Sequence, residues 1–170
     1  HTRSTWFWSP DSDKTLRDLD FLMNVYVETI GRGANLLVNM TPDTSGLIPE
    51  MEVERLSEFG RNIEQIFSTL LGNTSLPTDI SGQEYVINFP RKSKVDLLVI
   101  EEGIQQGQHI EKYKVEAYLN GEWLPIAEGQ TVGRKRIQFF DPIKTDKIRL
   151  SLIGEEGKMV IDNYAVYLSK

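Results

Sequence analysis

The fold of this chain is decided by residues 31–49, which read GRGANLLVNMTPDTSGLIP. Residues 34–40 form an apolar run without the alternation of a half-exposed strand, a pattern typical of a strand buried on both faces of a parallel sheet. The polar residues 41–46 that follow are rich in turn formers. The sequence therefore predicts a strand of an α/β fold, which needs further strands beside it.

Helical patterns flank this predicted strand. Upstream, Ser12 or Asp13 can cap a helix that ends at the Gly-Arg-Gly step. Downstream, a second helix is expected from Pro49, because proline is tolerated in a first turn, and Gly72 would end it. Apolar residues recur at helical spacing in both: Leu16, Leu19, Leu22, Met23, Tyr26 and Ile30 in the first, and Val53, Leu56, Phe59, Ile63, Ile66, Phe67 and Leu70 in the second.

The hydrophobic period changes near residue 75. Six short segments beyond it carry strand patterns, several with a period of two: residues 85–89, 95–100, 113–119, 136–140, 147–152 and 163–168. Asn120-Gly121 is a strong signal for a type I′ hairpin turn. We therefore predict two domains, an α/β segment over residues 1–75 and an all-β sandwich over residues 76–170.

Composition excludes several classes of function. The apolar fraction of 39% and charged fraction of 26% fit a globular protein, and a net charge of −6 gives no general attraction to nucleic acid. No run approaches the roughly 18–20 apolar residues that span a membrane. There are no cysteines and only two histidines, so we expect no disulfide, no metal site and no cofactor. The aromatic cluster close to residue 1 predicts that the sequence begins inside a larger protein.

Four stretches carry a resemblance to a known family. They are Trp6-Phe7-Trp8 and residues 26–49, 101–110 and 131–137. In this order they resemble the α-L-fucosidases of glycoside hydrolase family 29. That family has a tryptophan-aromatic pair, a helix that ends in a glycine-arginine step, a Leu-Leu-x-Asn strand and a Pro-x-x-x-Gly-x-Ile-Pro loop.

The resemblance implies a (β/α) TIM-like barrel followed by a galactose-binding-like β-sandwich of the jelly-roll type. Residues 1–75 would be the last helix–strand–helix of the barrel. Because barrel active sites lie at the carboxyl ends of the strands, Trp6, Trp8 and Asn39 are candidate substrate-binding residues. The tryptophans could stack on a sugar ring or belong to the barrel core. Asn39 could bind near the substrate or hold the strand-end loop together.

The resemblance also implies a reaction. A retaining exo-α-L-fucosidase uses an Asp nucleophile and a Glu acid/base about 5–5.5 Å apart to release terminal fucose from glycans. Both carboxylates are expected upstream, so this segment has no catalytic residue and is predicted to be inactive alone. Its partners would be a fucosylated glycan and the rest of the barrel. The alternative is a non-catalytic module that binds carbohydrate or braces the barrel. The family's periplasmic, extracellular or lysosomal location is implied by the resemblance alone.

Other polar residues have a plainer interpretation beside a functional one. Asp43 is expected in an Asx-turn rather than in catalysis. The pairs Glu101-Glu102 and Glu155-Glu156 are expected to be solvated charges, since neighbours on a strand point to opposite faces. The basic run 134–136 could bind a sulfated or sialylated glycan, pair with acidic barrel residues, or form a solvated strand face.

Trp123 and His109 could form a carbohydrate-binding surface on the sandwich, although a Trp after a hairpin turn more often packs a sheet edge. Two stretches match the N-glycosylation pattern, Asn39-Met40-Thr41 and Asn73-Thr74-Ser75. The first falls in the predicted buried strand and is interpreted as chance. The second would be used only in a secretory eukaryotic host.

Overall fold

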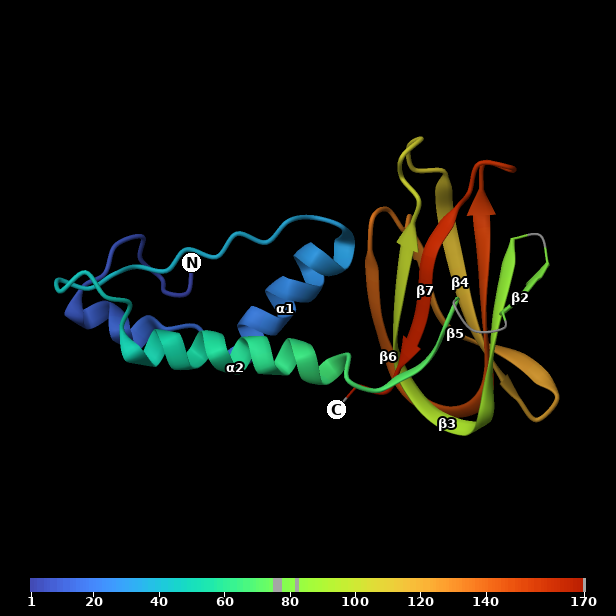
Figure 1. The fold of residues 1–170 in the computed structure, drawn as a ribbon, viewed down its shortest axis with the longest axis horizontal. Helices are drawn as coiled ribbons and strands as arrows, with labels where there is room; N and C mark the ends of the chain where they lie inside the picture. Colours follow the sequence, from blue (N-terminus) through green and yellow to red (C-terminus); the bar gives the residue numbers. More distant parts are fainter. Residues whose placement is uncertain (75–77, 82, 170) are drawn as a thin grey trace.

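The structure, a computed structural model, describes residues 1–74, 78–81 and 83–169. It is elongated, with helices at one end and strands at the other (Figure 1). The helical part, residues 1–69, contains the 3₁₀ helices η1 (Pro10–Thr15) and η2 (Ile30–Arg32) and the α-helices α1 (Leu19–Thr29) and α2 (Glu50–Ile66). The sheet follows from residue 70: β1 (Leu70–Asn73), β2 (Thr78–Ser81), β3 (Glu84–Glu102), β4 (Ile110–Leu119), β5 (Glu122–Gln130), β6 (Arg136–Gly154) and β7 (Ile161–Tyr167).

Helix α1 begins later than the sequence predicted. Its N-cap is Asp18, whose carboxylate accepts a hydrogen bond from the backbone N–H of Phe21 at 2.8 Å. The predicted cap at Ser12 or Asp13 is wrong, because both residues lie in the separate helix η1. Leu16 has an extended ψ of 126°, so one helix cannot run through it.

Helix α2 begins after Pro49 as predicted, but it ends at Ile66 instead of continuing to Gly72. The residues after it turn into β1, which pairs antiparallel with β7. A Cβ on Gly72 would lie 2.5 Å from the Ile87 side chain, so glycine is needed there for close packing within the sheet. The sheet thus begins before the predicted boundary at residues 75/76, and that boundary itself falls outside the described residues.

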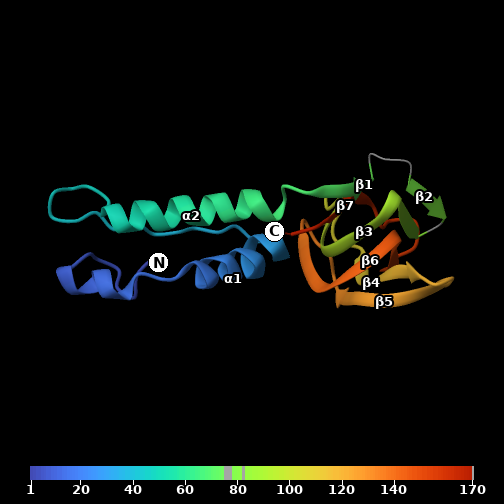
Figure 2. The ribbon, with the colours of Figure 1, turned by 90° about the horizontal axis from the view of Figure 1, so that it is seen from below.

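The strand predicted over residues 34–40 is not formed. The segment runs extended from the sheet end of the helices back to the start of α2 (Figures 1 and 2), but it belongs to no ladder among the described residues. Its side chains are not buried on both faces, since Leu37 is 93% exposed. A parallel strand is stable only between neighbours that satisfy its backbone, and no described strand lies beside this one.

The strands form one antiparallel sheet in the order β1-β7-β3-β6-β4-β5, with β2 paired to β3. The six predicted segments fall in four of the seven strands, β3, β4, β6 and β7, except that Leu168 lies one residue beyond β7. Residues 85–89 and 95–100 both belong to β3, and residues 136–140 and 147–152 both belong to β6. The turn between β4 and β5 has φ values of 52° at Asn120 and 95° at Gly121, which confirms the predicted hairpin.

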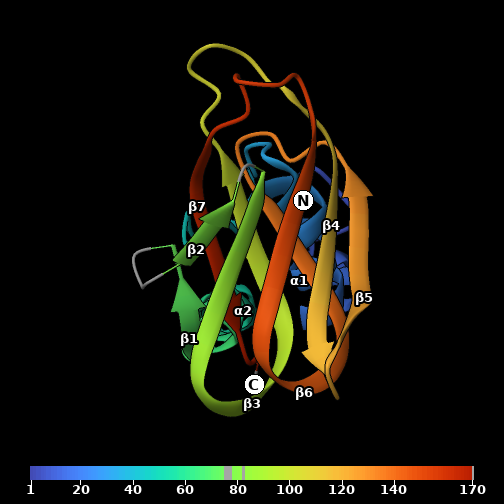
Figure 3. The ribbon, with the colours of Figure 1, turned by 90° about the vertical axis from the view of Figure 1, so that its right-hand side faces the viewer.

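The two long strands bend and carry the sheet from one layer to a second (Figure 3). The beginning of β3 lies between β2 and the end of β6, whereas the end of β3 lies between β7 and the beginning of β6. The register shift between Asn88 and Ser93 marks the bend. The main core fills the space between the layers and includes Ile87, Leu98, Ile100, Tyr113, Val115, Ile148, Leu150, Tyr164 and Val166.

A second, smaller core joins the helices to the outer face of one layer. Leu97, Val99 and Ile137 of the sheet pack there with Ile66 of α2 and with Met23 of α1. Gly31 lies so close that a Cβ would be 2.9 Å from the Cβ of Ile137. Within the described residues, no helix is long and apolar enough to cross a membrane.

Candidate functional site

A buried ion pair organises the N-terminal segment at the end of the helical part away from the sheet (Figure 1). Nε of Arg3 lies 3.0 Å from Oε2 of Glu52 in the first turn of α2, and the two side chains are 1% and 0% exposed. The hydroxyl of Thr2 donates to the other oxygen of Glu52. These contacts fasten residues 2 and 3 to α2, because a buried charge needs its partner to offset the loss of water.

The same arginine connects to one of the candidate sugar-binding residues. Nη1 of Arg3 donates to Oδ1 of Asp13 at 2.6 Å, and Nε1 of Trp8 donates to that oxygen at 3.0 Å. Asp13 is held in η1, where Ser9 and Ser12 form a capping box. The half-buried Trp8 is therefore fixed through Asp13.

Trp6 and Asn39 meet in space, although they are far apart in the sequence. The amide nitrogen of Asn39 lies 3.1 Å from Nδ1 of His1 and 3.4 Å from the backbone oxygen of Trp6. The His1 and Trp6 rings are in edge contact at 4.4 Å, and Trp6 is 62% exposed. The structure thus brings two of the three candidates together and holds Trp8 separately, while their role toward a sugar stays a prediction.

Asp43 forms the expected Asx-turn. Its Oδ1 accepts hydrogen bonds from the hydroxyl and the backbone N–H of Ser45 at 2.5 and 2.7 Å. The hydrogen bond from the Ser45 hydroxyl is the main cause that lowers the pKa of Asp43. A carboxyl with a lowered pKa is ionised at neutral pH and is a poor proton donor, which agrees with a role in the turn.

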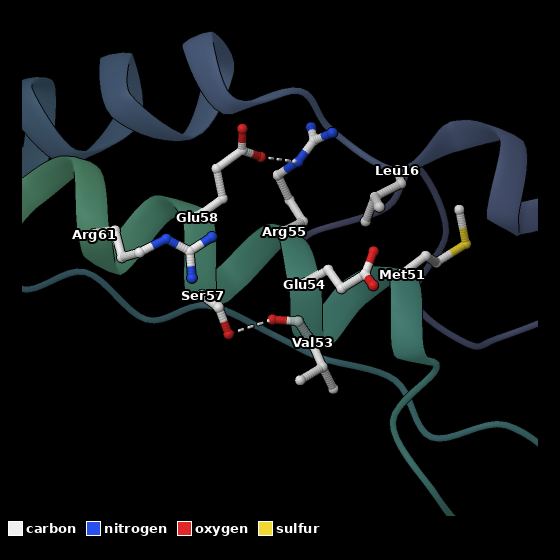
Figure 4. A pocket seen from close by; sticks show the side chains of 8 residues that line it. All are labelled: Leu16, Met51, Val53, Glu54, Arg55, Ser57, Glu58 and Arg61. Atoms are coloured by element: carbon white, nitrogen blue, oxygen red, sulfur yellow. Dashed lines mark hydrogen bonds and ion pairs between the residues drawn. The ribbon is translucent and has the colours of Figure 1, made fainter.

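A groove of about 650 Å³ runs along the exposed side of α2 (Figure 4). The apolar side chains Leu16, Met51 and Val53 lie toward the start of α2, and Arg55 and Glu58, one turn apart on the helix, form an ion pair at 3.1 Å. None of the three candidate residues lines it. The lining residues are Leu16, Met51, Val53, Glu54, Arg55, Ser57, Glu58 and Arg61.

Glu102 departs furthest from its sequence prediction. It is buried, and its carboxylate accepts hydrogen bonds from the backbone N–H groups of His109, Ile110 and Gly133 at 2.6–3.0 Å. The expected solvated charge is therefore wrong for Glu102. The three bonds join the two sheet segments that carried the family resemblance, residues 101–110 and 131–137. No signal in one sequence separates such a carboxylate from a solvated one.

Two residues of the basic run have partners inside the protein, whereas Arg134 is exposed. Lys135 pairs with Glu101 at 2.8 Å. Arg136 donates to the hydroxyl of Tyr113 at 3.0 Å, and its guanidinium lies over that ring. A Cβ on Gly33 would meet Arg134 and Lys135 at 3.4 Å, so this run also lies against the end of η2. Its position favours bracing over capture of an anionic glycan.

The remaining polar candidates of the sheet have internal partners. Trp123 carries the guanidinium of Arg149 on its ring at 4.5 Å and the edge of Tyr118 at 5.2 Å. Nδ1 of His109 lies 3.0 Å from Glu155, which also pairs with Lys158, so Glu155 is half exposed but not free. The glycosylation pattern at Asn39 falls in the extended segment and not in a strand, and the second pattern ends at Ser75, outside the described residues.

Comparisons with known proteins agree on one family. The model of the alpha-L-fucosidase family matches residues 1–66. A crystal structure of a candidate α-L-fucosidase from Bacteroides thetaiotaomicron superposes with a TM-score of 0.90 and 32% identity, over 100% of this chain and 38% of that one. The chain belongs to glycoside hydrolase family 29, the α-L-fucosidases.

Other α-L-fucosidases match the same segment. A Ruminococcus gnavus family 29 fucosidase, crystallised with fucose, has a TM-score of 0.87 and 28% identity over 99% of this chain and 40% of that chain. Alpha-L-fucosidase 1 of Arabidopsis thaliana is 26% identical over 99% of this chain and 39% of its own length. The chain therefore spans about two fifths of the family 29 relatives that it matches.

Proposed function

We propose that this chain is part of a retaining exo-α-L-fucosidase that releases terminal α-L-fucose from glycans. The observation that carries the proposal is the meeting of Trp6 and Asn39 at the end of the extended segment in a chain of family 29. The Ruminococcus relative with bound fucose supports the choice of sugar. Fucosylated glycans are the proposed substrates, and the rest of the barrel is the proposed partner.

In this proposal residues 1–75 are the last helix–strand–helix of a (β/α) barrel, and residues 34–40 become a strand once neighbours flank them. The direction of the chain supports this arrangement. The segment starts beside the sheet at Gly33 and ends at Asn39, where Thr2 donates a backbone hydrogen bond to it. Since barrel active sites lie at the carboxyl ends of strands, the pocket would be at the Asn39 end.

The proposed work of this segment is to shape the pocket. The ring of Trp6 or Trp8 offers an apolar plane to the C–H face of a sugar, and the amide of Asn39 can exchange hydrogen bonds with a hydroxyl. The nucleophilic Asp and the acid/base Glu would come from upstream strands, so the segment would not hydrolyse fucosides alone. Phe7, Leu37 and Leu47 are exposed here, which fits faces that the rest of a barrel would cover.

The test is hydrolysis of an aryl α-L-fucoside by the full-length parent, with the 170-residue segment assayed in parallel. Activity in the parent alone is expected. Trp6→Ala and Asn39→Ala in the parent should each raise KM about tenfold, the size of one lost sugar contact. Ile153→Ala, an exposed change on the sheet, is the matched control and should leave KM unchanged. A folded parent that is inactive on aryl and natural fucosides would refute the proposal.

For the sheet, a jelly-roll sandwich that braces the barrel is the second proposal. Support comes from the small core around Ile137 and from the close approach of Gly31. These contacts lie at the end opposite Asn39, away from the proposed pocket. The rival role is independent sugar binding, but one face of Trp123 already carries Arg149. Fucose-dependent quenching of Trp123 fluorescence in residues 68–170 would favour the rival.

A further inference from the structure

The contacts around Trp8 assign a task to a residue that the family resemblance did not single out. We propose that Asp13 is a positioning residue: it fixes the Trp8 indole on the wall of the sugar pocket, and the buried pair Arg3–Glu52 anchors it. This inference rests on the proposed fucosidase function, because that function makes Trp8 part of the wall. Asp13 acts only through Trp8 and does not touch the sugar.

The anchor is rigid for electrostatic reasons. Arg3 and Glu52 are both buried, and moving either one away would leave an uncompensated charge in the interior. The guanidinium presents its donors in a fixed fork, with Nε on Glu52 and Nη1 on Asp13. The position of Asp13 is thereby tied to the first turn of α2.

The hydrogen bond to Trp8 then sets the rotation of its ring. An indole has a single N–H donor, and that of Trp8 donates to Oδ1 of Asp13 at 3.0 Å. That oxygen is held at 2.6 Å by Arg3 on its other side, so the acceptor cannot swing with the ring. The backbone of η1, which follows Trp8 directly, is fixed by the bonds between Ser9 and Ser12.

Trp6 provides the contrast. It is largely exposed, and its ring is in edge contact with the ring of His1. Within the described part of the chain, its indole N–H donates no hydrogen bond. Of the two tryptophans, Trp8 is therefore the one whose ring orientation is fixed. A ring that is ordered before the sugar arrives loses no rotamer freedom on binding, so its contact contributes more to affinity.

The kinetic test is a double-mutant cycle in the full-length parent with an aryl α-L-fucoside. Trp8→Phe keeps an aromatic ring but removes the N–H, and Asp13→Ala removes the acceptor. Each should raise KM about tenfold with kcat nearly unchanged. The double variant should also show about tenfold, because both changes break the same contact. An increase in KM near a hundredfold in the double variant, or variants that lower only kcat, would overturn the positioning role.

Two variants separate positioning from general damage to η1. Asp11→Ala removes a neighbouring carboxylate that is exposed and, among the residues the structure describes, pairs only with Lys14 at 3.4 Å, so KM should not change. Asp13→Asn keeps an acceptor oxygen for the indole and should recover most of the wild-type KM. A KM for Asp13→Asn as high as that of Asp13→Ala would argue against the proposed hydrogen bond.

A second readout does not depend on activity. In the full-length protein the indole N–H proton of Trp8, assigned through Trp8→Phe, should be protected from exchange with solvent, and Asp13→Ala should abolish that protection. If the wild type hydrolyses no fucoside, the proposed function fails, whereas loss of protection still reports the bond. Loss of protection without a change in KM would refute the link between the bond and sugar binding.

Discussion

The sheet and the helical part differ in how far each completes its own interior. The sheet encloses a continuous apolar core between its two layers, with Leu98 and Ile148 wholly inaccessible, although single apolar side chains such as Ile153 are exposed. The helical part leaves Leu37, Phe7 and Leu47 open to solvent, and its extended segment lacks strand partners in the described structure. We therefore expect the sheet to be stable by itself and the helical part to need further apolar cover.

The largest effect should come from separating the two regions. Residues 68–170 keep every strand including β1, so we expect cooperative thermal unfolding, followed by circular dichroism. Residues 1–67 should show weak helicity and no cooperative transition, since isolated amphipathic helices are marginal in water. A fragment that begins at residue 76 lacks β1 and should melt at a lower temperature. Cooperative melting of residues 1–67 would show instead that the helical part is stable by itself.

Two leucines test the same difference at single positions. Leu98→Ala in β3 removes side-chain volume from a site with 0% exposure and should cost about 2–5 kcal/mol in urea unfolding of the 170-residue segment. Leu37→Ala, at 93% exposure, should change that free energy by less than about 0.5 kcal/mol. In the full-length protein the cost of Leu37→Ala should rise, because a barrel would bury it. An equally small cost there would refute the predicted strand.

This difference also explains what could be predicted from the sequence. Four strands of the sheet, β3, β4, β6 and β7, and the Asn120-Gly121 turn could be predicted, because their pattern and their partners lie in the same chain. Residues 34–40 have an equally clear pattern, but pattern alone does not supply neighbours, so no strand forms. The end of α2 was missed because Leu70 fits both the helical period and the start of β1, and pairing with β7 decides between them.

The candidate site was predictable in part for a similar reason. Trp6 and Asn39 could be proposed from motif order, and their meeting depends on a backbone contact between residues 2 and 39 that one sequence does not encode locally. The network of Arg3, Asp13 and Glu52 joins the N-terminal segment, η1 and α2. Each of these residues alone resembles an ordinary surface charge. Burial, not residue type, gives Arg3 and Glu52 their role, as it does for Glu102. The partly exposed Asp13 takes its role from its contacts with Arg3 and Trp8.

Gly31, which lies against the sheet, and Gly60, which does not, test the contact between the two regions. Gly31→Ala would put a Cβ 2.9 Å from Ile137, and the overpacking should cost about 1–3 kcal/mol while loosening the helices from the sheet. Gly60→Ala in α2 meets nothing within 4 Å and should instead stabilise the helix by about 0.5–1 kcal/mol. Urea unfolding gives both free energies, and hydrogen exchange in α1 reports the loosening. A neutral Gly31→Ala would mean that the small core does not hold the two regions together.

The smallest expected effect is a pH dependence that belongs to the sheet. Burial acts to raise the pKa of Glu116, but hydrogen bonds from Lys114 at 2.6 Å and Arg149 at 2.7 Å outweigh it and lower the pKa. A folded pKa below the unfolded value stabilises the protein above the unfolded pKa of about 4.3, and this stability is lost as pH falls through the folded pKa. Wild-type residues 68–170 should therefore lose about 1 kcal/mol more than Glu116→Gln between pH 6 and pH 3. Glu122→Gln, at an exposed position on the neighbouring strand, should follow the wild type. If Glu116→Gln also follows it, the ion pairs on the outer face contribute nothing to the stability of the sheet, which then rests on its apolar core alone.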